Sequence, residues 1–241
     1  MNIYVPDYYS TFHCIASSCG HTCCAGWEID IDAESLSRYE RMAGAFGERV
    51  RESISREETP HFILGENERC PLLNSANLCE LIRHEGESAL CQICRDHPRF
   101  RNYFSCRVEM GLGLVCEEAA RIILSWPHPL RLIRIDGDDV ESPTEEERYL
   151  FDLRSRWLSS IREEGPRARL METLILRHLP DALYDGRLET RIGFINRAFA
   201  DITGGWKDGR LPTLVDRARA FSDRVEYDDE VFEAWLCPDP E

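Results

Sequence analysis

The stretch "FHCIASSCGHTCCAGWEIDID", residues 12–32, places Cys14, Cys19, Cys23 and Cys24 within eleven residues, the last two side by side. Thiols grouped in this way can form disulfides, pack as inert core residues, or bind a metal ion or cluster. The rest of the chain has to separate these three alternatives.

The composition is that of a globular protein. A chain of 241 residues with 43% hydrophobic and 10% aromatic residues can bury a substantial core, as one large domain or two small ones. No run approaches the roughly 20 apolar residues of a membrane span. The start, "MNIYVPDYYSTF", has neither the basic nor the apolar region of a secretion signal. We therefore expect a cytoplasmic protein.

The charge balance limits the partners. A formal net charge of −15 argues against a nucleic-acid binder, which needs a basic face, and against binding to anionic membranes. We expect no nucleic-acid and no membrane partner, whereas a basic protein partner remains open. Lys207 is the only lysine, so the chain offers few lysines of its own for modification.

The cysteine count favours metal binding. Ten of the eleven cysteines lie in residues 14–116, the number is odd, and a reducing compartment disfavours structural disulfides. Burial as inert core residues could account for a few of them, such as Cys106, Cys116 and Cys237. It does not account for pairs at ligand spacing.

Local patterns predict the elements of the first 136 residues. Asp32 is the expected N-cap of a helix, which Gly44 and Gly47 are expected to break before the charged stretch 48–58. Asn74–Asn77 are expected to form a turn. The remaining elements are helices at 78–86 and 87–97, a strand or hairpin at 100–116, a helix at 116–126 and a strand at 129–136.

From Pro143 onward, apolar residues recur at helical spacing. The predicted helices are 144–163, 167–184, 187–202, 212–224 and a short one at 228–236. The fold class expected is mainly α with a small β element: a cysteine-rich metal-binding module over residues 1–136, followed by a helical region over residues 143–241.

The spacing of the thiols points to a metal centre. The first group reads C-x4-C-x3-CC and the second, from Cys70, reads C-x8-C-x11-C-x2-C. Four thiolates complete either a tetrahedral zinc site or an iron–sulfur cluster. Adjacent side chains of an extended backbone point to opposite faces, so whether Cys23 and Cys24 serve one centre or two stays open. The candidate ligands are Cys14, Cys19, Cys23, Cys24, Cys70, Cys79, Cys91 and Cys94, with His13, His21, His84 and His97 as possible substitutes.

Three segments carry a resemblance to a known family: "FHCIASSCGHTCCAGWEIDID", "CPLLNSANLCELIRHEGESALCQICRDHPR" and "CEEAARIILSWPHPLRLI". Over about residues 8 to 136 the chain resembles the flagellin lysine-N-methylases, part of a wider group of zinc- or iron-chelating cysteine-rich domains. The matching features are the TCC-x-GW turn, the CPLL…LC pair, the LC-x2-C-x3-PR segment and the C-x-EAAR helix.

The resemblance implies methyl transfer from S-adenosylmethionine to lysine side chains of flagellin or another protein, in a protein that carries a [4Fe–4S] cluster, with zinc as the alternative. It also implies that the eight cysteines named above are the motif cysteines. Two features depart from the family. Its members are commonly longer, and the C-x3-C-x2-C loop of radical-SAM enzymes is absent here.

Other residues leave alternatives open. Tyr8, Tyr9, Phe12 and Trp27 are expected to pack over the metal centre. Glu109, Glu117 and Glu118 could orient a substrate amine, although carboxylates on a solvated helix face are the simpler interpretation. We assign no catalytic residue and no S-adenosylmethionine pocket. The rival hypothesis is a non-enzymatic zinc- or iron-binding module.

Overall fold

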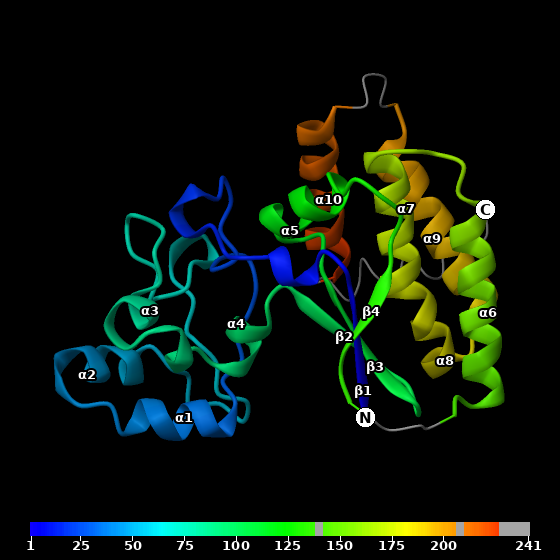
Figure 1. The fold of residues 1–241 in the computed structure, drawn as a ribbon. Coiled ribbons are helices and arrows are strands. Elements are labelled where there is room, and N and C mark those ends of the chain that lie inside the picture. The colour runs from blue at the N-terminus through cyan, green and yellow to red at the C-terminus, as the bar shows by residue number, and fades with distance from the viewer. Residues whose placement is uncertain (138–141, 206–209, 227–241) are drawn as a thin grey trace, which may run out of the picture. The chain divides into compact units, whose positions relative to one another are not determined.

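The computed structural model describes residues 1–137, 142–205 and 210–226 (Figure 1). The chain forms two compact units. Residues 14–97 make up a cysteine-rich unit, and residues 1–13 join residues 98 onward in a second, sheet-and-helix unit. These boundaries differ from the sequence-based boundary between 136 and 143, because β1, the β2–β3 hairpin and α5 pack with the C-terminal helices. The mainly α composition with a small sheet is confirmed.

Short helices and turns build the cysteine-rich unit. Its helices are α1 (Ala33–Glu40), α2 (Gly44–Glu52), α3 (Glu80–Glu85) and α4 (Gln92–Asp96). Asp32 caps α1 as predicted, because its Oδ1 accepts from the Ser35 amide at 2.9 Å. The buried side chains of Ile29, Tyr39, Phe62 and Leu72 form a small separate core that also includes Cys70 and Cys91.

Two predicted boundaries in this unit are wrong. The predicted break at Gly44 is confirmed, since α1 ends at Glu40 and α2 begins at Gly44 with φ +76°, but Gly47 lies inside α2, where a side chain would clash with the Met42 backbone. The helix expected over 87–97 is broken: a 3-10 turn at Glu87–Ala89 precedes α4, and extended backbone at Cys91 separates the two.

The second unit contains a mixed four-stranded sheet. Strands β1 (Asn2–Pro6), β2 (Arg99–Tyr103), β3 (Arg107–Leu112) and β4 (Leu132–Asp136) lie in the order β2-β3-β1-β4. The β2–β3 hairpin and strand β4 confirm the predictions for these segments. Strand β1 was not predicted, and it lies parallel to β3 and antiparallel to β4.

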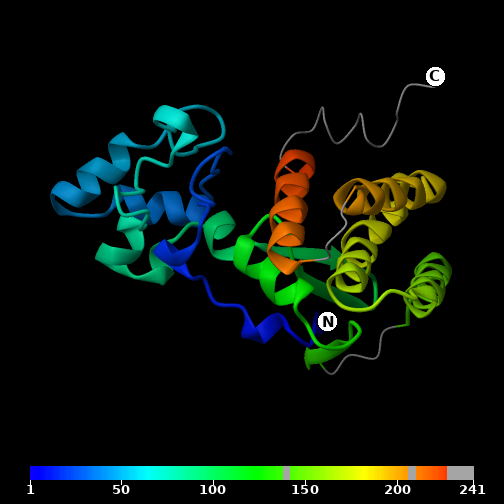
Figure 2. The ribbon, with the colours of Figure 1, turned by 90° about the horizontal axis from the view of Figure 1, so that it is seen from above.

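The helices of this unit surround α7. They are α5 (Glu117–Leu124), α6 (Glu145–Ser160), α7 (Pro166–His178), α8 (Ala182–Asp185), α9 (Leu188–Thr203) and α10 (Leu211–Glu226). Helix α7 contacts α5, α6, α9 and α10, and α5 also packs on α10 (Figure 2). Leu170, Leu174, Ile175, Phe194 and Leu214 lie in the shared core.

The predicted helical segments are largely confirmed. Thr144 and Glu147 form a capping box at the start of α6. The segment predicted as 167–184 divides at a 3-10 turn, Leu179–Asp181, which contains Pro180. The helix predicted at 228–236 and Cys237 lie outside the described residues. None of the helices in the described ranges is long and apolar enough to span a membrane.

Candidate metal centre

Backbone pairing brings the first and second cysteine groups together. The Cys70 amide donates to the Cys24 carbonyl at 2.8 Å, and the Gly26 amide donates to the Glu68 carbonyl at 3.2 Å. Gly26 has φ +90°, a value that favours glycine, and the turn lets the Trp27 indole donate back to the Cys23 carbonyl at 2.8 Å. The TCC-x-GW motif is thus a turn that places Cys24 beside Cys70.

An asparagine turn positions Cys79. The Asn74 side-chain oxygen accepts from the amides of Ala76 and Leu78, as predicted for a turn at Asn74–Asn77. The chain then folds back, and the Glu80 amide donates to the Leu72 carbonyl at 2.8 Å. Cys79 therefore lies next to the segment that carries Cys70, at the residue just before α3 begins.

The CxxC motif lies on α4. Cys91 precedes the helix and Cys94 lies inside it, so the two side chains fall on one turn. Asp32 links this helix to α1, because its Oδ2 accepts from the Gln92 amide at 2.7 Å while its Oδ1 caps α1. These two hydrogen bonds outweigh the opposing effect of burial and lower the pKa of Asp32 to about 2.

Five thiols interact with one another electrostatically: Cys24, Cys70, Cys79, Cys91 and Cys94. Burial raises the pKa of Cys70 to about 12 and also raises that of Cys79. Cys94 donates to Cys91, which lowers the pKa of Cys91, and a hydrogen bond with Cys23 lowers the pKa of Cys24. A nearby cation would stabilise all five as thiolates.

The sulfurs are assembled but are not arranged as a finished coordination sphere. In residues 1–137, 142–205 and 210–226, no three Cys, His, Asp or Glu side chains are grouped closely enough to hold one metal ion. The ten described cysteines are free thiols. The donors fit zinc or an iron–sulfur cluster in kind and number, and side-chain rotations would have to complete the geometry.

The remaining predicted ligands lie on the surface or in other contacts. Cys14 and Cys23 are exposed, and Cys19 is half-buried. Cys14 Sγ accepts from the Ala16 amide at 3.4 Å. His84 stacks on Phe46 with ring centroids 4.1 Å apart, and His97 stacks on Trp27.

Most of the aromatic residues expected over the metal centre belong to the other unit. Tyr8 and Phe12 are buried in the core of the sheet-and-helix unit, and Tyr9 packs against that core. Only Trp27 packs against the cysteine-rich core. The expectation was wrong for the three residues of the first segment because they continue from β1 into its own core.

Two of the glutamates considered for amine binding already form ion pairs with arginines. Glu109 is fully buried on β3 and pairs with Arg154 through both oxygens, at 2.5 and 2.7 Å, and with Arg107 at 2.6 Å. Glu118 pairs with Arg121 one turn along α5. Neither carboxylate is available to a substrate amine as placed.

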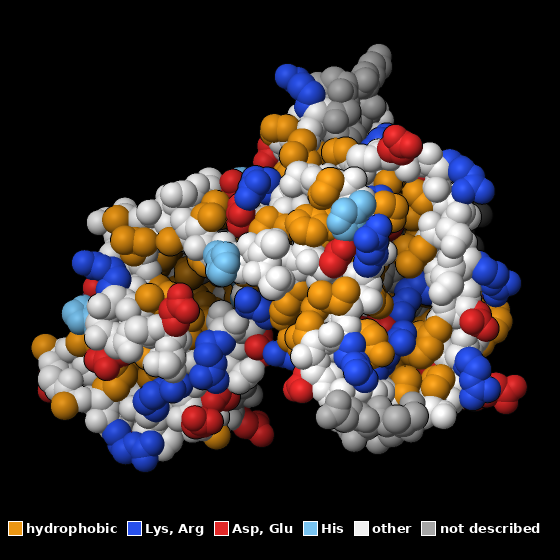
Figure 3. Space-filling model, viewed as in Figure 1, with side chains coloured by type: hydrophobic (Ala, Val, Ile, Leu, Met, Phe, Trp, Pro, Cys, Tyr) orange, Lys and Arg blue, Asp and Glu red, His pale blue; other side chains and the backbone are white. Residues whose placement is uncertain are grey.

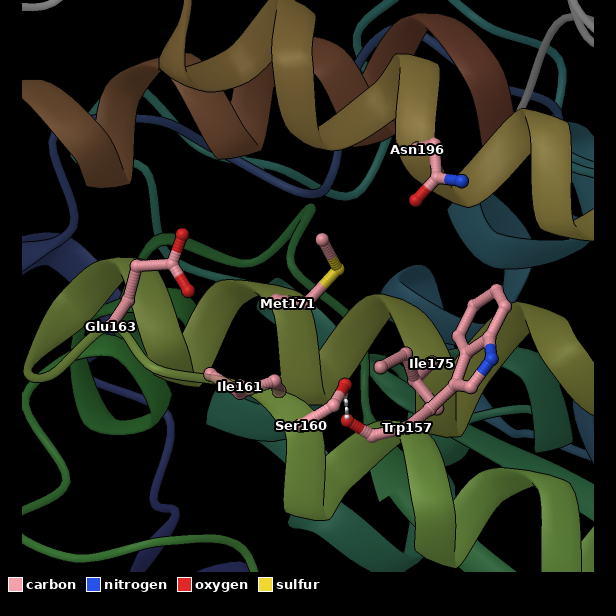
Figure 4. A pocket seen from close by; sticks show the side chains of 7 residues that line it. All are labelled: Trp157, Ser160, Ile161, Glu163, Met171, Ile175 and Asn196. Carbon is pink, nitrogen blue, oxygen red and sulfur yellow. Dashed lines mark hydrogen bonds between the residues drawn. The ribbon is translucent and has the colours of Figure 1, made fainter.

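A small hollow lies between α6, α7 and α9 of the second unit. Its volume is about 230 Å³, and Figure 4 shows the side chains that line it. Its more buried residues are Trp157, Ile161, Met171 and Ile175, and its exposed ones are Ser160, Glu163 and Asn196. On the face drawn in Figure 3, acidic and basic side chains are interspersed with hydrophobic ones on both units.

The fold and the site define a mainly α protein with a cysteine-rich unit in which five thiols influence one another electrostatically. Comparison with curated proteins finds three similar proteins. Over 136 residues, 53% of this chain, it is 26% identical to the flagellar biosynthetic protein FliU of Salmonella muenchen, with 79% of that protein covered. It is equally similar to the lysine-N-methylases of Salmonella typhimurium strain LT2 and Salmonella choleraesuis strain SC-B67, with 33% of each covered.

The chain is therefore similar to lysine-N-methylases and to FliU, which confirms the resemblance predicted from the sequence. The match spans about a third of the length of the lysine-N-methylases. No family model and no solved structure matches the chain.

Proposed function

We propose that this protein acts in the methylation of lysine side chains on a flagellar protein such as flagellin. The observation that carries the proposal is the similarity to two lysine-N-methylases and to a flagellar biosynthetic protein. The sequence itself is consistent with a substrate on another chain, because Lys207 is its only lysine.

The second part of the proposal is a metal centre in the cysteine-rich unit. Four of the five converging thiols, Cys24, Cys70, Cys79, Cys91 and Cys94, would hold a [4Fe–4S] cluster, or zinc in the alternative. Such a group, when bound, ties the segments that carry these cysteines into one rigid core. The other predicted cysteine ligands, Cys14, Cys19 and Cys23, would not bind the metal in this proposal.

S-adenosylmethionine is the methyl donor in this proposal. Transfer requires a neutral lysine amine in line with the sulfonium methyl group, and a polar site that orients the amine and accepts its proton. What the chain has to supply is therefore a binding site for a primary amine and a proton acceptor.

The proposal is tested by incubating the anaerobically purified chain with flagellin and S-adenosylmethionine that carries a deuterated methyl group. Mass spectrometry of flagellin peptides should then find labelled methyl groups on lysines. A chain with Cys70 and Cys91 changed to alanine serves as the control and should transfer none. Unlabelled lysines after incubation with metal-loaded wild-type protein would overturn the proposal.

A second candidate is a non-enzymatic metal-binding module. The observation in its favour is the coverage of the relatives: the match includes 79% of FliU but only 33% of the lysine-N-methylases. The shared region is thus most of one flagellar protein and a minor part of the enzymes. Stable metal content together with no methyl transfer would favour this candidate.

A further inference from the structure

A second group of polar side chains lies in the sheet-and-helix unit, away from the cysteines. Asp7 follows β1, residues 126–130 connect α5 to β4, and Arg169 to Thr173 lie on α7 (elements labelled in Figure 1). Two hydrogen bonds fix these segments: the Asp7 amide donates to the Arg131 carbonyl at 2.9 Å, and the Leu130 amide donates to Glu172 Oε2 at 3.0 Å.

His128 is oriented at the surface of this group. Its Nδ1 lies 3.5 Å from Asp7 Oδ2 and 3.2 Å from the Pro129 carbonyl, and its ring meets the edge of Trp126. The His128 side chain is 35% exposed and that of Asp7 is 17% exposed, so both can be reached by a ligand. Both polar contacts use Nδ1, which leaves Nε2 as the nitrogen that can accept a proton.

A buried polar layer lies beneath the pair. Arg169 and Glu172 form an ion pair at 2.9 Å, and both side chains are more than nine-tenths buried. Tyr8, 2% exposed, packs edge-on against Trp126 and lies beside Thr173. Burial raises the pKa of Glu172 and of Tyr8.

Three buried polar atoms of this group have no hydrogen-bond partner among the described residues: Asp7 Oδ1, Trp126 Nε1 and Arg169 Nε. Leaving such an atom unpaired costs stability, so several in one place mark a site that is not optimised for stability alone. They lie around the same aromatic residues that orient His128.

We propose that Asp7 and His128 form a binding site for a primary amine, with His128 Nε2 as the proton acceptor. One N–H bond of the ammonium breaks, its electron pair stays on the amine nitrogen, and a new N–H bond forms on His128. The Asp7 carboxylate attracts the ammonium and then stabilises the imidazolium. The proton passes from His128 to solvent.

Charge selects an amine over an anion at this site. The Arg169 guanidinium is neutralised by Glu172, so the charge that remains beside His128 is the Asp7 carboxylate. The partly buried ring of Trp126 also favours a cation. That the amine is a lysine side chain rests on the proposed function; the amine site itself does not.

The first test is an NMR titration of the full chain with n-butylamine, with no methyl donor present. The His128 ring signals should shift on titration, and Asp7→Asn should weaken binding by at least about tenfold, the loss of one charge-assisted contact. His61 is the internal control, because its Nε2 lies at the same 3.5 Å from Glu28 but in the other unit. Unshifted His128 signals, or equal binding by Asp7→Asn, would overturn the inference.

The second test uses methyl transfer. His128→Ala should slow it by about 10²–10⁴-fold, and added imidazole should restore part of the rate, which a purely structural defect would not allow. His61→Ala should transfer at the wild-type rate. Full activity of His128→Ala would overturn the inference while leaving the proposed function intact. Amine binding by wild-type protein, together with no methyl transfer, would overturn the proposed function and leave the amine site intact.

Discussion

At the scale of single residues, the Glu109 carboxylate is the clearest case of a charge held for stability. It has no exposed surface and bonds two arginines, Arg154 and Arg107, the first of them 6% exposed. We expect Glu109→Gln to lower the free energy of unfolding by about 3–5 kcal/mol, because it leaves buried guanidinium charges without a counterion.

The control for that experiment is Glu118→Gln. The partner of Glu118, Arg121, is 55% exposed, so water can replace the lost contact and the cost should be about 1 kcal/mol or less. Urea denaturation of both variants measures the difference. Equal losses would contradict a stabilising role for the buried pair.

His178 should make the second unit sensitive to acid. Burial, helped by Arg177 and Arg191, lowers the pKa of His178 well below 6.5, so the folded protein keeps this ring neutral. Its stabilising contribution is present above the unfolded pKa of about 6.5 and is lost as pH falls toward the folded pKa. The loss is at most about 1.4 kcal/mol per pH unit.

We therefore expect His178→Gln to flatten the pH dependence of the free energy of unfolding between pH 6.5 and 5. The exposed His13 supplies a matched control, and His13→Gln should keep the wild-type curve. Denaturant titrations across this pH range make the comparison. Parallel curves for wild type and His178→Gln would show that the buried ring carries no such linkage.

At the scale of elements, the β2–β3 hairpin depends on the absence of a side chain at Gly111. A Cβ there would lie 2.2 Å from Cζ of Phe100 on the neighbouring strand, whose ring also borders the Arg177 guanidinium. Gly111→Ala should lower stability by about 1–3 kcal/mol, since the ring has to move out of its place in a packed sheet.

Gly193 gives the opposite expectation. It lies inside α9, and a Cβ would meet only the mobile end of Arg197 at 3.2 Å. Gly193→Ala should raise stability by up to about 1 kcal/mol through helix propensity. Thermal unfolding should thus move in opposite directions for the two variants, and a decrease for both would contradict the packing argument.

The sequence predicted those elements whose signals are local. Helices α6, α7, α9 and α10 follow from apolar spacing, and α1 follows from its cap at Asp32. Strand β1 was missed because it forms by pairing with β3, a hundred residues later in the chain, and no local pattern signals that pairing. The break at Cys91 was missed for a similar reason, since Asp32 holds the start of α4 from a distant segment.

The candidate site was likewise predicted only in part. Spacing alone could name eight cysteines, but which of them converge depends on the pairing of residues 24–26 with 68–70, which no local pattern encodes. Asp7 and His128 lie far apart in the sequence, in "VPDYY" and "WPHPL", and no sequence pattern links the two stretches. Only the fold brings them together.

At the scale of the whole molecule, removal of the proposed metal should affect the two units differently. Residues 14–97 have a small core that includes Cys70 and Cys91, whereas residues 98–226 have a larger core without the candidate ligands. Hydrogen exchange after chelation should therefore show lost protection in residues 14–97 and little change in α5 to α10. Uniform loss, or no change at all, would contradict a metal centre confined to the cysteine-rich unit.

The most direct test of the account is the metal content of anaerobically purified protein. We predict iron and acid-labile sulfide in equal amounts in the wild type, their loss in Cys91→Ala, and their retention in Cys14→Ala, because Cys91 is fully buried among the converging thiols and Cys14 is exposed. Stoichiometric zinc without iron would mean that the centre is a zinc site rather than a cluster. Protein that binds neither metal, or that loses it equally in both variants, would contradict the proposed centre.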